Sequence, residues 1–213
     1  IIEMANIGRP VLLRGSSTNG VGRNIELFRD TMSSAGFNDE AVEKALDQIW
    51  VWREMHVAET EEKALENARQ FRWMQGEFTG LAHPSWASPA GYSSPSNRRA
   101  FVEFSIGRRE NPRGLTTFED QVEQGRIICG TPKSVLPKIR RVLEETRPSI
   151  YAVWGNDGSV SHEDSMTCIR LLGEEVFPAV REIGKELGLN SPFEADAPVH
   201  LKYSTDLKKS AAE

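Results

Sequence analysis

The stretch from Gly130 to Val180 constrains the fold more than any other part of the chain. It begins with a helix that Thr131 caps, and Pro132 occupies the first turn, where its missing N–H costs nothing. The apolar positions of this helix form a single stripe: Val135, Leu136, Ile139, Val142 and Leu143. A buried strand (Ser149–Trp154), a glycine-containing loop and a second phased helix follow. This order predicts one helix–strand–helix unit of a wound α/β fold.

The second helix of this unit is expected to begin at Ser161, with Asp164 completing a capping box. Its predicted core face is Met166, Ile169, Leu172, Val176, Val180 and Ile183. Pro178 lies inside the helix and should kink it, because proline removes a backbone hydrogen bond. The residues from Asn190 onward are polar, and we expect a frayed tail there.

Two more strand-then-helix units precede this one. Arg9–Leu13 is a short apolar run with a loop after it, and Gly22–Ala35 has helical spacing. Asp39–Leu46 continues as a short second helix. Gln48–Ala58 is rich in β-branched and aromatic residues and is the strongest predicted strand. Thr60 is a good N-cap for the helix after it. Three strands that alternate with helices predict a parallel sheet.

The segment 76–124 has a different character, with several prolines and scattered aromatic residues. A loop this long is unusual inside a compact domain, and it is typically either a functional lid or disordered. Its aromatic content argues against a plain linker. We therefore predict a lid-like excursion that packs partly on the body and contains a short helix near Asn97–Phe104.

Composition narrows the class of protein. A chain of 213 residues with 38% hydrophobic content predicts one domain with a sizeable core. The net charge of −5 and the lack of a basic run argue against a nucleic-acid partner. No stretch approaches the roughly 18 apolar residues of a membrane span, so no membrane partner is expected.

The cysteines and histidines indicate neither a disulfide framework nor a metal. Cys129 and Cys168 read as small buried hydrophobes, and a reducing cytoplasm is the simplest compartment for them. The four histidines have no metal-ligand spacing to one another or to a cysteine. We expect no metal site.

An ordered set of motifs resembles the C-terminal part of the luciferase-like flavin-dependent monooxygenases. The motifs are Arg53–Thr60 (REMHVAET), the proline-rich stretch, Gly130-Thr131-Pro132, the strand Ser149–Trp154, and Leu172–Pro178 (LGEEVFP). One departure is Lys63-Ala64, where the family usually has Glu-Ala. Any single motif is weak, but the correct order over most of residues 1–185 carries the resemblance.

The resemblance implies a (β/α)8 TIM barrel of which this chain holds about the last three strands. Arg9–Leu13 would be the sixth strand, Gln48–Ala58 the seventh and Ser149–Trp154 the eighth, so the chain would begin well inside the barrel. Residues 1–190 would then be the C-terminal part of one barrel domain, with 76–124 as a lid-like insertion and 191–213 as a polar tail. Much of the family's flavin phosphate grip would lie in the absent strands.

The same resemblance implies a function. In this family FMN, reduced by a partner flavin reductase, reacts with O2 and oxygenates a small organic substrate while the protein excludes water. A deazaflavin-dependent hydride transfer without oxygen is an alternative. A non-catalytic shortened barrel that binds flavin or dimerises through its open edge is another. An unrelated phosphate-binding barrel ranks last, because Ala58-Glu59-Thr60 is not a glycine-rich loop. Either a homodimer or a heterodimer is expected.

Active sites of such barrels lie at the C-terminal ends of the strands. At the first strand end, Arg14, Ser16 and Ser17 offer a cation and hydroxyls to a flavin phosphate or a substrate, and a solvated loop is the alternative. At the last strand end, Trp154 could form a wall for the isoalloxazine ring or simply fill the core. Asn156 lies in a loop that could bind an anion or be a plain turn.

Two further residues are candidates. Arg53 lies on the strand face opposite Trp50 and Trp52, since strand side chains alternate. We interpret it as a structural ion pair with Glu54 or a more distant carboxylate, with a flavin contact as the alternative. His83, inside the expected lid, is the only histidine considered as a catalytic proton donor.

Overall fold

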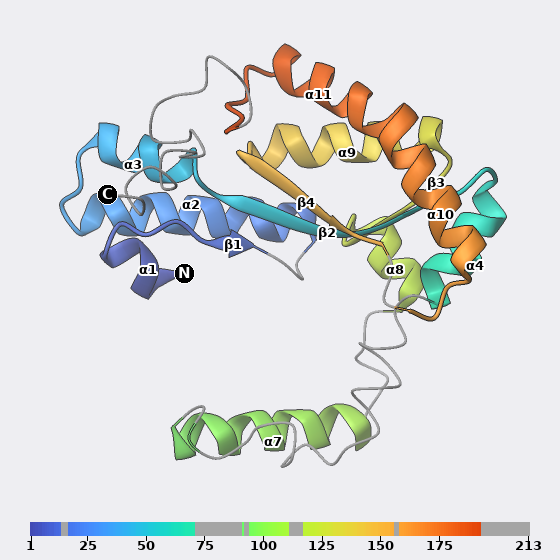
Figure 1. The fold of residues 1–213 in the computed structure, drawn as a ribbon. Helices are drawn as coiled ribbons and strands as arrows, with labels where there is room; N and C mark the ends of the chain where they lie inside the picture. The colour runs from blue at the N-terminus through green and yellow to red at the C-terminus, as the bar shows by residue number, and fades with distance from the viewer. Residues whose placement is uncertain (14–16, 71–90, 92–93, 111–116, 156–157, 193–213) are drawn as a thin grey trace, which may run out of the picture.

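A computed structural model describes residues 1–13, 17–70, 91, 94–110, 117–155 and 158–192 of the chain. Its centre is a parallel sheet flanked by helices (Figure 1). The strands are β1 (Leu12–Leu13), β2 (Trp50–Val57), β3 (Ile127–Gly130) and β4 (Ile150–Trp154). The expected class, α/β with a parallel sheet, is confirmed.

Strand β2 is the centre of the sheet, and the other three strands pair only with it. β1 and β4 both pair with Trp50 and Val51, so they must lie on opposite edges of β2. The N–H of Trp50 donates to Val11 on the β1 side, and the N–H of Ala58 donates to Gly130 of β3. Backbone groups alternate between the two edges along a strand. β3 therefore lies on the same edge as β1, further along β2.

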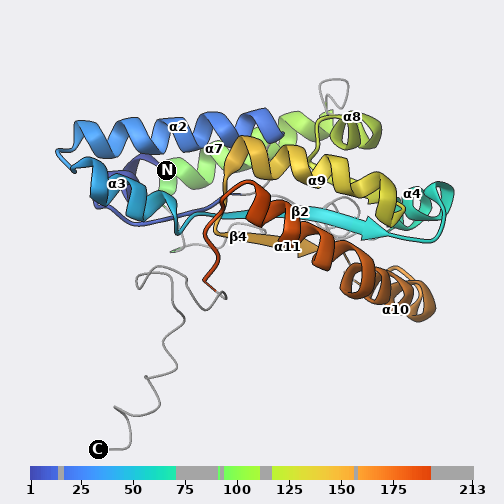
Figure 2. The ribbon, with the colours of Figure 1, turned by 90° about the horizontal axis from the view of Figure 1, so that it is seen from above.

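The helices surround this sheet. Their bounds are α1 (Ile2–Asn6), α2 (Thr18–Ser34), α3 (Asp39–Leu46), α4 (Glu61–Gln70), α7 (Pro95–Glu110), α8 (Phe118–Glu123), α9 (Pro132–Thr146), α10 (His162–Leu171) and α11 (Phe177–Glu186). Figure 2 shows α2 and α9 side by side along one side of β2, and these two helices are in contact. Helix α7 is set apart from these layers (Figure 1).

The main core lies between the sheet and α2, α9 and α10. Phe28 and Met32 of α2, Ile139 of α9 and Val51 and Met55 of β2 are all at most 1% exposed. Burying each such side chain stabilises the fold by about 1.5–3 kcal/mol relative to an exposed position. Because the partners come from distant parts of the chain, this core fixes β2 against α2 and α9.

Helix boundaries follow the capping residues named from the sequence. Thr131 accepts a hydrogen bond from the N–H of Ser134 at the start of α9, and Ser161 accepts one from the N–H of Asp164 at the start of α10. The hydroxyl of Thr60 accepts the N–H of Lys63 at 3.2 Å. These side chains satisfy backbone donors that have no partner within the helix. Of the helices described, none combines the length and apolar character that a membrane span requires.

The elements differ from the expectation in places. Strand β3 was not predicted, and the helix expected near 97–104 is present but longer, as α7. The predicted core face of the last helix also fails at its start, where Met166 and Ile169 are 51% and 54% exposed and Cys168 is buried. The cause is a π-helical turn at Leu172–Val176, which inserts one extra residue per turn and shifts the phase of everything before it.

Candidate site at the C-terminal ends of the strands

One face of the sheet is covered by helices along its length, and the opposite face is open only in part, since Glu54 and His56 on it are 6% and 0% exposed. Val51, Met55 and Val57 point toward the helices, so the alternating side chains of Trp50, Trp52, Glu54 and His56 point to the other face. On that second face Trp50 is 44% exposed, and Leu12, its partner in the register, is 49% exposed. Large apolar side chains at this exposure on one face mark a surface suited to a further layer.

Trp154 ends β4 on the same open face. It pairs in register with Glu54, and its ring meets that of Trp52 edge to face, with centroids 5.6 Å apart and planes at 78°. Aromatic pairs prefer this geometry over a face-to-face sandwich. Trp154 remains 42% exposed, so it is not ordinary core filling. One side of its indole is fixed by Trp52, and the rest is available to a flat ligand.

Arg53 lies on the covered face, opposite Trp154. It is 1% exposed, and its Nη1 donates to the Trp52 carbonyl oxygen at 3.0 Å. Its Nε and Nη2 have no hydrogen-bond partner. Burial lowers the pKa of Arg53 below its ordinary value, and the nearby Tyr151 opposes that shift. The ion pair expected for Arg53 is wrong, because among the described residues no carboxylate lies within salt-bridge distance of it.

The Gly-Thr-Pro motif has a structural role at the N-terminus of α9. Glu61 accepts hydrogen bonds from the N–H and the hydroxyl of Thr131, both at 2.9 Å. Hydrogen bonds from Ser134 and Thr131 lower the pKa of Glu61 below its usual range. A Cβ on Gly130 would overlap the Ser134 hydroxyl and lie 2.8 Å from Glu61 Oε2. The anion-binding end of α9 is therefore occupied by the protein's own carboxylate.

His56 of β2 contacts both the residue that follows β4 and helix α4. Its Nδ1 lies 3.2 Å from the carbonyl oxygen of Gly155, and its Nε2 lies 3.1 Å from Nδ2 of Asn67 on α4. Burial lowers the pKa of His56. Neither His56 nor Asn67 was expected to matter from the sequence. The residues after β4 are thus attached to β2 and α4 through buried polar groups.

The remaining predicted site residues are placed as follows. Ser17 caps α2, and its hydroxyl accepts the N–H of Gly20 at 3.1 Å. Arg14, Ser16, His83 and Asn156 lie outside the described residues. The flavin or substrate contacts predicted for Arg14 and Ser16 after β1, and the proton-donor role predicted for His83, therefore remain predictions. The described residues contain no group of three or more His, Cys, Asp or Glu side chains that could hold a metal.

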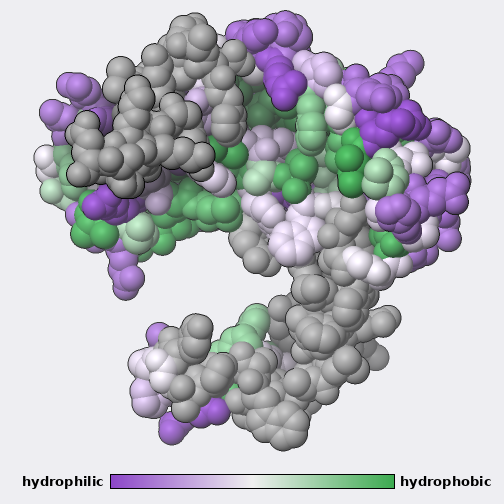
Figure 3. Space-filling model, in the orientation of Figure 1, coloured by the Kyte–Doolittle hydropathy of each residue, from purple (hydrophilic) through white to green (hydrophobic). Residues whose placement is uncertain are grey.

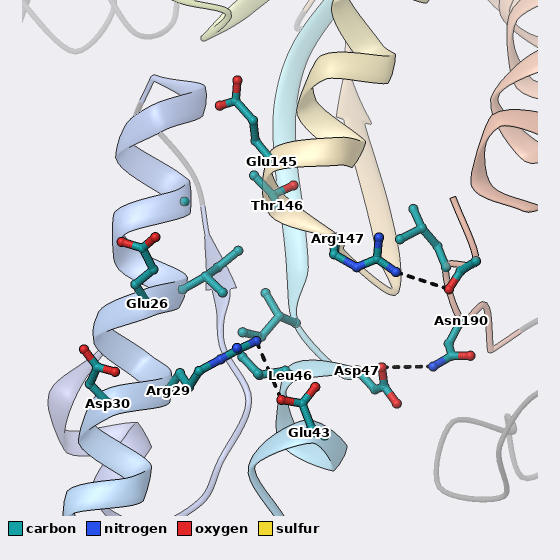
Figure 4. Close-up of a pocket in the computed structure, with 15 residues that line it drawn as sticks. Glu26, Arg29, Asp30, Glu43, Leu46, Asp47, Glu145, Thr146, Arg147 and Asn190 are labelled. Atoms are coloured by element: carbon teal, nitrogen blue, oxygen red, sulfur yellow. Dashed lines mark hydrogen bonds and ion pairs between the residues drawn. The ribbon is translucent and has the colours of Figure 1, made fainter. Parts of the chain in front are cut away.

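The hollow in Figure 4 lies at the other end of the sheet. It has a volume of about 740 Å³ and is bordered by Ile49, just before β2, and Arg147, just before β4. Two pairs of its charged or polar side chains are bonded to each other, Arg29 with Glu43 at 3.6 Å and Asn190 with Asp47 at 3.0 Å. The N-terminal end of barrel strands serves stability in folds of this type. We do not assign the candidate site to this hollow.

Solved structures identify the fold. RslO1, a monooxygenase from Streptomyces bottropensis, matches with a TM-score of 0.50 and 19% identity, over 83% of this chain and 44% of its own. The oxygenating constituent of 3,6-diketocamphane monooxygenase from Pseudomonas putida, a type II Baeyer-Villiger monooxygenase solved with FMN, matches with a TM-score of 0.50 and 17% identity, over 84% and 44%. The fold is that of part of a luciferase-like flavin monooxygenase.

This finding confirms the resemblance at the level of the fold. The chain spans less than half the length of each of these two monooxygenases. No family model matches the sequence, and no curated protein matches it. The activity of a whole luciferase-like enzyme is therefore a matter for proposal.

Proposed function

We propose that this chain forms the C-terminal part of a flavin-dependent monooxygenase that oxygenates a small organic substrate with reduced FMN and O2. The observation that carries the proposal is the open face of the sheet, on which Trp154 stands half exposed at the C-terminal end of β4. Flat ligands stack on such rings, and barrel enzymes hold their ligands at this end of the strands. The fold shared with an FMN-bound monooxygenase supports the choice of cofactor.

In this proposal the sheet is the C-terminal section of a (β/α)8 barrel and is three strands wide. The central strand is β2, with β1 and β3 along one of its edges and β4 along the other. The outer edges of β1 and β4 pair with no other described strand. A width of three strands out of eight is compatible with the coverage, since the match spans 44% of the length of each of the two monooxygenases. The remaining strands would cover Leu12 and Trp50.

Trp154 would form one wall for the isoalloxazine ring, and Asn156 and the residues Arg14, Ser16 and Ser17 would contact the flavin phosphate or the substrate. Arg53 does not enter this site, because its side chain lies on the helix-covered face of the sheet.

The chemistry needs more than this chain's described residues. Bound FMN, reduced by a flavin reductase, would supply the reaction with O2, and this chain's part is to orient the flavin and exclude water. The segment 76–124, which contains α7, would serve as the lid, with His83 as a proton donor. Both buried cysteines are free, which fits the reducing cytoplasm of the proposal.

The test is a titration of FMN and reduced FMN into the 213-residue chain, followed by tryptophan fluorescence and calorimetry. Trp154→Ala should raise the Kd roughly 2- to 12-fold, the value of one aromatic contact. Trp50→Ala is the matched control, because Trp50 is equally exposed on the same face but lies at the N-terminal end of β2. Equal effects of the two variants would refute the placement of the flavin.

A second candidate function is a non-catalytic, flavin-binding shortened barrel that dimerises. The exposed Leu12 and Trp50, next to the open edge of β1, favour it, since open strand edges invite pairing with another chain. Light scattering on the same samples separates the two. A stable dimer that binds FMN without oxygenating any substrate favours this candidate.

A further inference from the structure

The strongest unexplained feature is a buried polar bridge beneath the end of β4. His56 and Asn67 are 0% and 1% exposed, and each side chain contacts a different element. His56 reaches Gly155 after β4, and Asn67 of α4 reaches His56. Buried polar groups are costly unless they are bonded, so their presence here indicates a specific role.

The hydrogen bonds define the protonation of His56. The Asn67 Nδ2 group can only donate, so Nε2 of His56 must accept from it and carries no proton. The single ring proton is then on Nδ1, where it donates to the Gly155 carbonyl oxygen. A doubly protonated ring would place two donors against each other at Asn67 in this orientation of the amide. The bridge as oriented here therefore contains the neutral imidazole.

The same bridge also reaches the start of α10. The hydroxyl of Ser161 holds the pKa of the Asp164 carboxyl below its usual range, and Lys63 and Asn67 on the facing side of α4 act in the same direction. Lys63, one turn earlier on α4, lies 3.2 Å from the Asp164 carboxylate. The chain that leaves β4 is thus held at Gly155 and again at Asp164 by one short helix and the strand before it.

The lack of a side chain at Gly155 allows this close approach to β2. A Cβ at this position would overlap the carbonyl oxygen of Met55 on β2. The backbone of Gly155 therefore lies directly against β2, where His56 can reach its carbonyl group. The preceding residue is Trp154, so the bridge also holds the backbone from which that ring projects.

We propose that His56 and Asn67 are positioning residues, which hold Gly155 and so orient Trp154 at the end of β4. The flavin-orienting part of this role rests on the proposed function. The titratable groups that face His56 are Asp164 of α10, Lys63 of α4, Glu54 on the same face of β2 and Cys129, its register partner on β3. In this orientation of Asn67, protonation of His56 removes the Nε2 lone pair that accepts from the amide.

The test compares two substitutions that each preserve half of the bridge. The amide of His56→Asn occupies the place of Nδ1 and can still donate to Gly155. The amide of His56→Gln occupies the place of Nε2 and can bond only Asn67. The measurement is amide hydrogen exchange of peptides covering β4 and Gly155 at pH 7.5, with α9 peptides as the internal reference for global stability.

We expect exchange around β4 and Gly155 to be about tenfold faster in His56→Gln than in His56→Asn, relative to α9. In the wild type that relative protection should fall between pH 7.5 and 5.5, and in His56→Asn it should not. Equal acceleration in the two variants, or acceleration shared fully by α9, would mean a general packing role and would overturn the proposal.

Failure of the proposed function gives a different result. If the wild-type chain binds no FMN but the exchange pattern is as expected, the bridge stands and the flavin assignment falls. If FMN binds equally well to both variants while their exchange differs as expected, the bridge holds Gly155 without orienting the flavin wall.

Discussion

Substituting Gly155 by alanine tests how closely the end of β4 is packed on β2. The new Cβ would overlap the Met55 carbonyl oxygen, and Met55 lies in the middle of the central strand. A backbone oxygen there cannot turn aside as a flexible side chain would. Non-bonded heavy atoms are at their optimum near 3.5–4 Å, so the two segments must separate by on the order of 1 Å.

The cost has two parts. Overpacking of this kind typically destabilises by about 1–3 kcal/mol. A separation of that size also lengthens the 3.2 Å contact between Gly155 and His56, and losing one such hydrogen bond costs about 0.5–1.5 kcal/mol. We expect a total loss of roughly 2–4 kcal/mol in the free energy of unfolding. For a chain of this size the Tm should fall by roughly 4–16 °C.

Gly184→Ala is the matched control. Gly184 lies within α11, and a Cβ there would meet no heavy atom within 4 Å. Alanine is favoured over glycine in a helix by about 0.5–1 kcal/mol, so this variant should be slightly more stable than the wild type. Urea unfolding and calorimetry measure both variants. If Gly155→Ala unfolds within 0.5 kcal/mol of the wild type, the close packing of Gly155 on β2 is wrong.

Three further predictions concern buried ionisable groups. Burial lowers the pKa of His56 below its ordinary 6.5, so the unfolded chain binds the proton more readily than the folded chain. The free energy of unfolding should therefore fall as the pH drops from 6.5 to the lowered pKa. Urea unfolding of His56→Asn should lack this contribution to the dependence of the unfolding free energy on pH. Burial raises the pKa of Cys129 to about 11, so iodoacetamide should label it only in denaturant; labelling of the native chain contradicts this. Arg53→Met removes a buried guanidinium whose Nε and Nη2 lack partners and should raise the unfolding free energy by about 1–2 kcal/mol, whereas a loss in urea unfolding would show that the charge is stabilised.

The regular elements of this chain could be predicted because their signals are local. The alternation in Gln48–Ala58 placed Trp50 and Trp52 on one face and Arg53 on the other, as the structure has them. β3 could not be recognised, because four residues give no usable alternation and its strand character comes from pairing with Glu54–Val57. The phase shift in the last helix was equally hidden, since the π-helical turn at Leu172–Val176 carries no marker in the sequence.

The bridge beneath β4 shows what kind of signal was overlooked. Lys63 and Asn67 are spaced as one face of α4, and they contact Asp164 of α10 and His56 of β2. At the end of this helix the backbone carbonyl oxygen of Gln70 accepts the hydroxyl of Ser159, which precedes α10. Ala64 and Ala68 lie beside them and pack against β3. A polar stripe next to small buried residues is not the pattern of a helix face in water, because the small side chains let the backbone approach another layer. The stripe therefore predicts protein partners for its polar groups. Only the fold can reveal that His56, the partner of Asn67, is itself bonded to Gly155, 99 residues along the chain.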